Sequence, residues 1–167
     1  MSIKDTLLPQ FDQEMTSTRK MLDRVPEDAI DWRPLPRSMT LGRLATHVAQ
    51  TPAWGQRALA ADSWDPAPPG STPPGPLTLR TRAEMLALFD DNVAQTRAAI
   101  AGADDVTFAK PWSLQRGGTP VFTMSKIGVI RGMLLSHLIH HRGQLSVYLR
   151  LRDVPVPGMY GPSADEK

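Results

Sequence analysis

The sequence predicts an all-α fold, a four-helix bundle in which residues 1–167 form a single domain. Four segments place apolar side chains three and four residues apart, which is the spacing of one helix face. One long crossover connection, rich in proline, lies between the second and third of these segments. A chain of 167 residues is long enough for one sizeable core, and amphipathic helices bury their apolar stripes by packing together.

The composition excludes several classes of protein. The chain has 19 Lys and Arg against 17 Asp and Glu, and no long basic run, which argues against nucleic-acid binding. An apolar run long enough to span a membrane and a signal peptide are both absent, so we expect no membrane contact and a cytoplasmic location. Because cysteine is also absent, any metal site must use His, Asp, Glu or water.

The first predicted helix covers residues 3–24, with Leu7 and Phe11 on its apolar stripe. Proline is tolerated in the first turn of a helix, so Pro9 suggests that the true start lies near Leu7 or Leu8.

The second helix is predicted over residues 40–61, with Ser38 or Thr40 as its N-cap. Its stripe includes His47, and Pro52 should kink the helix one turn later. Residues 65–76 hold six of the 16 prolines and are expected to form an extended, exposed loop.

The third helix should begin at Thr81, which forms a capping box with Glu84, and end at Gly102. Residues 106–124 contain a Gly-Gly pair between apolar stretches, which predicts a small β-hairpin before the last helix. That last helix is predicted as one element over residues 125–152.

Two histidines of the last helix indicate a metal site. His137 and His141 are four residues apart, so their imidazoles share one helix face, whereas His140 points elsewhere. His47 lies on the apolar stripe of the second helix and can complete a set of three ligands. Three histidines with an open fourth position are typical of catalytic zinc. Imidazoles equally suit nickel, copper and iron, and of these we expect zinc or nickel.

The alternative reading of these histidines is structural. A lone histidine on an apolar face is usually a core residue whose polar atoms are satisfied, but two neutral imidazoles on one stripe need several hydrogen-bond partners. Trp54 follows His47 by two turns on the same face and is expected either to line the metal pocket or simply to fill the core.

Several motifs give the chain a resemblance to the DinB/YfiT-like superfamily. They are residues 31–34 (Asp-Trp-Arg-Pro), residues 38–42 (Ser-Met-Thr-Leu-Gly) leading to His47, the pair His137 and His141 with the Arg-Gly-Gln that follows it, and residues 155–166. The resemblance spans nearly the whole chain and implies a four-helix bundle, often a homodimer, with a divalent ion on the three histidines.

Relatives with assigned activities are bacillithiol transferases and mycothiol-dependent maleylpyruvate isomerases. The resemblance therefore implies a thiol-dependent transferase or isomerase that acts on small electrophiles, with a low-molecular-weight thiol as a further cofactor. Gln144 or Arg142 would orient the ligand or hold a histidine tautomer, and Gln144 is the better placed on the helix. The alternatives are a metal-dependent hydrolase, which uses water as the nucleophile, and a non-catalytic protein that binds metal or a small ligand.

Overall fold

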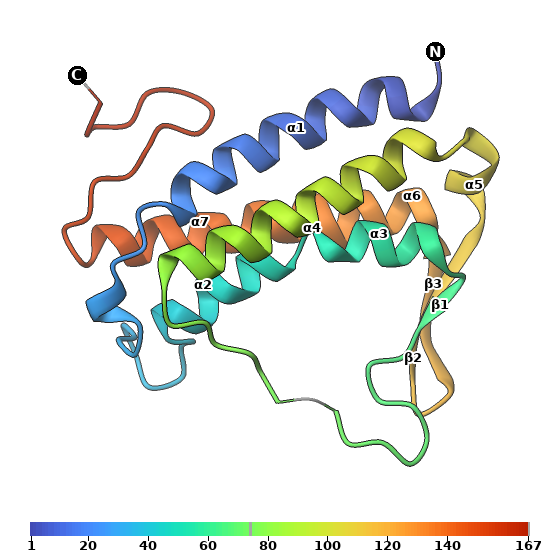
Figure 1. Cartoon of the computed structure of the whole chain (residues 1–167), viewed down its shortest axis with the longest axis horizontal. Coiled ribbons are helices and arrows are strands. Elements are labelled where there is room, and N and C mark those ends of the chain that lie inside the picture. The colour runs from blue at the N-terminus through green and yellow to red at the C-terminus, as the bar shows by residue number, and fades with distance from the viewer. Residues whose placement is uncertain (74, 167) are drawn as a thin grey trace.

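The structure, a computed structural model, describes residues 1–73 and 75–166. Helices dominate it (Figure 1). They are α1 (Ile3–Leu22), the 3-10 turn η1 (Glu27–Ala29), α2 (Leu41–Gln50), α3 (Ala53–Ala60), α4 (Arg82–Gly102), α5 (Asp105–Ala109), α6 (Lys126–Gly128), the π-helical η2 (Val129–Ser136) and α7 (His137–Arg150). The helix-dominated fold predicted from the sequence is thus confirmed. Within the described ranges, none of these helices combines the length and apolar character needed to cross a membrane.

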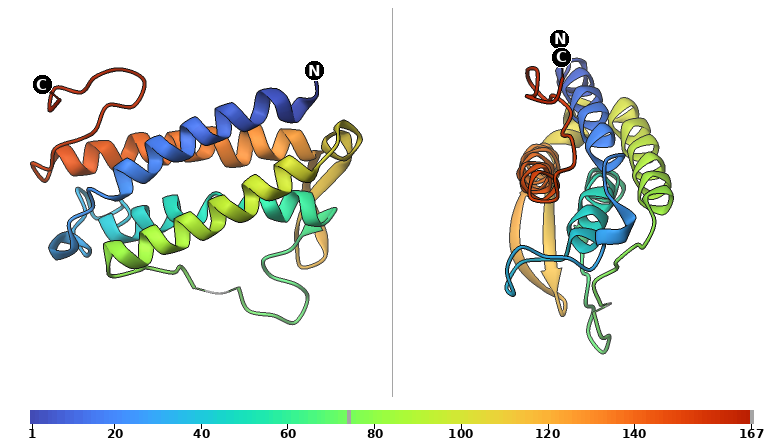
Figure 2. Two further views of the ribbon diagram at one scale, coloured as in Figure 1. Left: turned by 45° about the horizontal axis from the view of Figure 1, so that its top comes forward. Right: turned by 90° about the vertical axis from the view of Figure 1, so that its left-hand side faces the viewer.

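The long helical segments lie side by side. Helix α4 contacts α1, α2 and α3, while α7 contacts α1 and α2. Figure 2 shows α1, α4, the α2–α3 pair and the η2–α7 segment around a shared interior. That interior is filled by buried apolar side chains from every one of these elements, among them Phe11, Leu44, Phe89, Leu134 and Leu145.

Helix α1 begins earlier than the sequence suggested. It starts at Ile3, so the expectation of a start near Leu7 or Leu8 is wrong, and Pro9 lies inside the helix. The first turn is held by tertiary contacts, because the backbone N–H of Ile3 donates to Asp105 Oδ1 at 2.8 Å. Leu7 and Phe11 are both buried, and their packing offsets the backbone hydrogen bond that proline cannot make.

Pro52 separates two helices, α2 and α3, where the sequence suggested a single kinked one. Helix α4 supplies hydrogen bonds to the break. Asn92 Nδ2 donates to the Ala49 carbonyl at 3.1 Å, and the Thr96 hydroxyl donates to the Pro52 carbonyl at 2.7 Å. Thr96 Oγ1 also accepts the Gln56 backbone N–H at 3.2 Å. The break therefore keeps its backbone groups paired through side chains of another helix.

We expect Thr96→Val to lower the free energy of unfolding by about 1–3 kcal/mol, because it removes the acceptor of the Gln56 N–H and one of the two donors to the buried Pro52 carbonyl, which then keeps only the Gly55 N–H. Urea denaturation would measure the change. Thr16→Val is the matched control, since Thr16 is an exposed helical threonine whose hydroxyl bonds only within its own helix. An equal loss in both variants would show that Thr96 does not support the break.

A small sheet lies at one end of the helices (Figure 1). Strands β2 (Pro111–Arg116) and β3 (Thr119–Ser125) form the predicted hairpin, which turns through Gly117 and Gly118 at positive φ of 61° and 78°. A third strand, β1 (Ser63–Trp64), pairs parallel to β2, so the hairpin predicted from the sequence is part of a three-stranded sheet. The sequence did not predict β1, because two residues are too few to show a periodic pattern. Lys126 holds the residues just before this strand, with contacts to Ala61 O and Asp62 at 2.9 Å each.

The proline-rich residues 65–76 belong to the segment between β1 and α4. Within residues 65–73 and 75–81, no helix or strand is present. Helix α4 begins at the predicted capping box, in which Thr81 N donates to Glu84 Oε2 at 2.9 Å and Glu84 N donates to Thr81 Oγ1 at 3.2 Å.

The last helical segment is not one uniform α-helix, as the sequence suggested. It consists of α6, the π-helical η2 and α7. The Ser136 hydroxyl donates to the Arg131 carbonyl five residues earlier, at 2.9 Å, which matches the wider π turn. The π segment ends at Ser136, and α7 begins with His137.

Candidate metal centre

Helices α2 and α7 bring the three predicted histidines together. Thr40 caps α2 by accepting the Arg43 backbone N–H at 3.2 Å, and His47 follows on the partly buried side of that helix. His137 and His141 lie one turn apart at the start of α7, which contacts α2. The spacing of four residues therefore places two imidazoles opposite His47.

The three imidazoles form one compact cluster. His47 Nε2 and His137 Nε2 are 2.8 Å apart. The ring centroid of His141 lies 4.5 Å from that of His47 and 4.4 Å from that of His137. One ligand atom from each residue lies within 4.8 Å of the others, so the cluster could hold a metal ion.

The cluster favours neutral imidazoles. Burial, followed by the charges of His141, His137 and Arg43, lowers the pKa of His47 to about 4. Burial and neighbouring histidines also lower the pKa of His137. Burial lowers the pKa of His141 as well, although the hydrogen bond to Gln144 opposes it. A neutral imidazole is the form that ligates a metal.

Gln144 orients one of these rings. Its Oε1 lies 2.7 Å from His141 Nδ1, and an amide oxygen can only accept, so Nδ1 carries the proton. That tautomer leaves the lone pair on Nε2 free for a ligand. A second hydrogen-bonding partner that fixes the tautomer is typical of metal-bound histidine, and the sequence had singled out Gln144 for this role.

The donor set fits a divalent ion of the size of zinc. Zinc–nitrogen bonds of ~2.0–2.1 Å in a tetrahedral site place ligand nitrogens roughly 3.3 Å apart. That separation lies between two distances in the cluster. The Nε2 atoms of His47 and His137 are 2.8 Å apart, and all three ligand atoms lie within 4.8 Å of one another. Three neutral nitrogen donors and a hydrogen bond to Gln144 are the chemistry that such an ion requires.

The other residues singled out from the sequence lie in different surroundings. His140 is exposed, as expected, and its ring packs against that of His141. Arg142 was expected to support the ligand, but its buried guanidinium turns to α1, where it pairs with Glu14 at 2.7 Å. Trp54 lies on α3 beyond the break and lines a cavity together with His47.

That cavity, of about 440 Å³, opens beside the histidine cluster. Its polar lining is Arg43, Gln50, Arg57 and Asn92 together with His47, and none of these except His47 was identified from the sequence. Arg43 could have been found, because it lies four residues before His47 on the same helix face. The apolar lining comes from Trp54, Trp64 and Leu88, and from Pro66 and Leu77 of the segment before α4.

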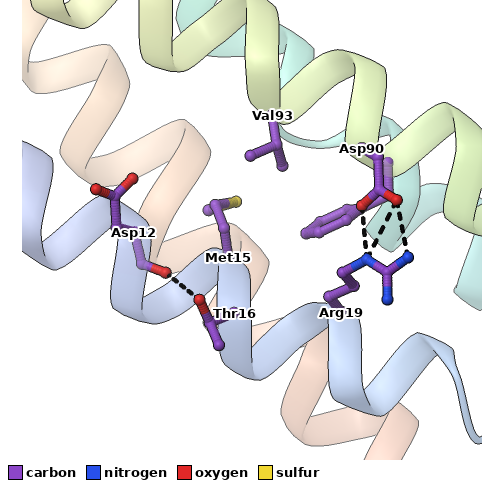
Figure 3. Close-up of a pocket in the computed structure, with 7 residues that line it drawn as sticks. Asp12, Met15, Thr16, Arg19, Asp90 and Val93 are labelled. Atoms are coloured by element: carbon purple, nitrogen blue, oxygen red, sulfur yellow. Dashed lines mark hydrogen bonds and ion pairs between the residues drawn. The ribbon is translucent and has the colours of Figure 1, made fainter.

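A second groove lies elsewhere, between α1 and α4, and has a different character. Figure 3 shows Arg19 and Asp90 facing each other across it, joined by two hydrogen bonds from Arg19 Nε and one from Nη2. Its lining contains no histidine. Ion pairs satisfy the charges of this groove, since Arg19 pairs with Asp90 and Asp12 pairs with Arg97, so the chemistry of the protein is expected at the histidine cluster.

Fold and site together define a helical protein with a three-histidine candidate metal centre. The family model of the DinB superfamily matches residues 10–145, and the chain belongs to this superfamily. The uncharacterized protein YrdA of Bacillus subtilis (strain 168) is 27% identical over 162 residues, which cover 97% of this chain and 90% of YrdA.

Solved structures of DinB-like proteins share the fold. A DinB-like protein from Bacillus cereus ATCC 10987 superposes with a TM-score of 0.74 at 20% identity, covering 95% of this chain and 98% of that one. The DinB-like protein YjoA of Bacillus subtilis gives a TM-score of 0.67 at 13% identity, with 97% and 99% covered.

Proposed function

We propose that this protein is a divalent-metal enzyme, loaded with zinc or nickel, that transfers a low-molecular-weight thiol to small electrophiles or uses it to isomerise them. The observation that carries the proposal is the cluster of three neutral imidazoles beside a cavity large enough for a small molecule. Three protein ligands leave a coordination position for a substrate atom. A bound dication lowers the pKa of a coordinating thiol and holds it as the thiolate.

The residues of the chain have separate tasks in this function. His47, His137 and His141 would hold the ion, and Gln144 would keep His141 in the tautomer whose Nε2 faces it. Trp54 and Trp64 form an apolar wall that excludes water from the electrophile. The chain has no cysteine, so the sulfur must come from a second molecule.

A spectroscopic test separates this proposal from its rivals. Protein loaded with Co²⁺ should gain a sulfur-to-metal absorption band when 2-mercaptoethanol is added, and ethylene glycol, which replaces the thiol by a hydroxyl, should leave the spectrum unchanged. A spectrum that ignores millimolar thiol would contradict thiol binding and favour the hydrolase or the non-catalytic protein.

An assay of zinc-loaded and metal-free protein, with 2-mercaptoethanol as the thiol, tests turnover. With 1-chloro-2,4-dinitrobenzene as the electrophile, a carbon–sulfur bond forms, the carbon–chlorine bond breaks, chloride leaves with its electron pair, and the thiol proton passes to water. Zinc-loaded protein should consume the electrophile faster than metal-free protein.

The packing of α1, the α2–α3 pair, α4 and the η2–α7 segment supports a further part of this proposal, a four-helix bundle as the scaffold of the site. A single domain over residues 1–167, a homodimer and a cytoplasmic location stay predictions.

A further inference from the structure

Arg43 carries a charge that the described part of the chain does not neutralise. It lies on α2, one turn before His47, and lines the cavity beside the histidine cluster. Its Nη1 is buried, and no hydrogen-bond partner for it is found among residues 1–73 and 75–166. A buried donor on a guanidinium is costly to leave unpaired, so an acceptor supplied by a molecule bound in the cavity would stabilise this side chain.

The contrast with other arginines is clear. Arg19, Arg80 and Arg97 each pair with an aspartate at 2.6–2.8 Å, and the buried Arg142 pairs with Glu14. Figure 3 shows the Arg19 pair, in which the carboxylate of Asp90 meets the guanidinium directly. These four arginines have carboxylate partners within the chain, whereas Arg43 lines a cavity and has a buried nitrogen with no partner among the described residues.

The remainder of the cavity suits a planar anion. Its second cation, Arg57, stacks on Trp64, with Cζ 4.8 Å from the ring centroid. Trp54 and Trp64 meet edge to face at a centroid distance of 5.0 Å. Among the described residues that line the cavity, no side chain is acidic. Two cations beside aromatic walls create a positive, partly apolar site.

We propose that this cavity binds a small, planar organic carboxylate, with its carboxylate group on Arg43 and its apolar body against Trp54 and Trp64. A guanidinium offers two parallel N–H donors that match the two oxygens of a carboxylate. As a statement about the substrate, the inference rests on the proposed function, because the carboxylate would be held beside the three histidines. Binding itself requires no metal.

Benzoate is the probe, and metal-free protein is the sample. Isothermal titration and tryptophan fluorescence should show saturable binding of benzoate, and benzamide, a neutral molecule of the same shape, should bind at least tenfold more weakly. Equal binding of the two probes to the unaltered protein would overturn the proposal without the need for any variant.

Variants locate the site. Arg43→Gln should weaken benzoate binding at least tenfold, and Arg43→Lys, which keeps the charge but loses the paired donors, should fall between. Arg37→Gln makes the same charge change at an exposed arginine outside the cavity and should bind benzoate as the unaltered protein does. Benzoate affinity that is the same in Arg43→Gln and Arg37→Gln would overturn the assignment.

The carboxylate could belong to the electrophile or to the thiol, and two probes separate these sources on zinc-loaded protein. Benzoate binding that falls in Arg43→Gln while 3-mercaptopropionate binding is kept assigns the carboxylate to the electrophile, and a fall for both probes shows that the thiol can place its carboxylate on Arg43 as well. Both results support the site, whereas benzoate binding that does not fall overturns it. His137→Ala distinguishes this inference from the proposed function, because it should lose zinc and still bind benzoate.

Discussion

Zinc affinity should fall at least a hundredfold when His47, His137 or His141 is replaced by alanine. Each replacement removes one of three neutral nitrogen donors that lie within 4.8 Å of one another. Loss of residues that only support a ligand typically costs 10–100-fold in affinity, so loss of a ligand itself should cost at least as much. Competition with a chromogenic chelator would measure the dissociation constant, with elemental analysis giving the metal content.

His140→Ala is the matched control for these variants. It removes an imidazole from the same helix, next to His141, but one that is exposed and outside the cluster. Its zinc affinity should equal that of the unaltered protein. If all three cluster variants also kept their zinc, the histidines would not be the ligands.

The pH dependence of zinc binding provides a second readout of the same prediction. Burial, with the neighbouring charges, lowers the pKa of His47 to about 4, below the ~6.5 of an unfolded chain. Without metal, protons bind the unfolded chain first, so stability present above pH ~6.5 is lost as the pH falls toward about 4. Protons compete for His47 in the folded protein only near the lower limit, and the pKa values of His137 and His141 are lowered as well, so zinc should still raise the melting temperature just below pH 6.5. A zinc-dependent rise in melting temperature that is already lost at pH 6.5 would contradict the low pKa of His47.

Replacement of Arg142 by leucine should lower the free energy of unfolding by about 3–5 kcal/mol, because it leaves the buried carboxylate of Glu14 without its cationic partner and with only the Tyr160 hydroxyl donating to it. Arg142 Nη1 also donates to Glu14 O and Thr18 Oγ1 at 3.1 Å each, and Nη2 donates to the Tyr160 hydroxyl at 2.7 Å. The substitution thus removes the hydrogen bonds that link α7 to α1 and to Tyr160 of the C-terminal segment. Urea denaturation would measure the loss, provided that the slope of the unfolding free energy against urea concentration is the same in both proteins.

Two comparisons make this prediction specific. Arg19→Leu removes an arginine from the exposed pair with Asp90 and should cost about 1 kcal/mol or less. The double variant Glu14→Leu, Arg142→Met leaves no buried charge unpaired and should be more stable than Arg142→Leu alone. A loss at Arg142 no larger than that at Arg19 would mean that the buried pair adds nothing to the fold.

Much of the site follows from local sequence. The spacing of His137 and His141 places them on one helix face, and the identity of Gln144 three residues later allows it to reach His141. The capping box at Thr81 marks the start of α4 correctly, and Gly117 with Gly118 marks the hairpin turn. Each of these features depends on residues a few positions apart, and for that reason the sequence alone predicts them.

Tertiary packing decided the features that depend on distant residues. Strand β1 forms because β2 pairs with it and Lys126 holds the two residues before it, and the break at Pro52 is kept by Asn92 and Thr96 from α4. Periodicity could not place the Arg142 guanidinium, since its partner Glu14 lies 128 positions earlier.

The sequence by itself thus determined which residues can ligate a metal and which helix faces carry them. Only the tertiary structure decided that His47 meets the other two histidines, and that Arg43 faces the cavity with a buried nitrogen for which the described residues offer no partner. The physical reason is that helical spacing sets the direction of a side chain relative to its own helix. What that side chain contacts depends on how the helices pack against one another.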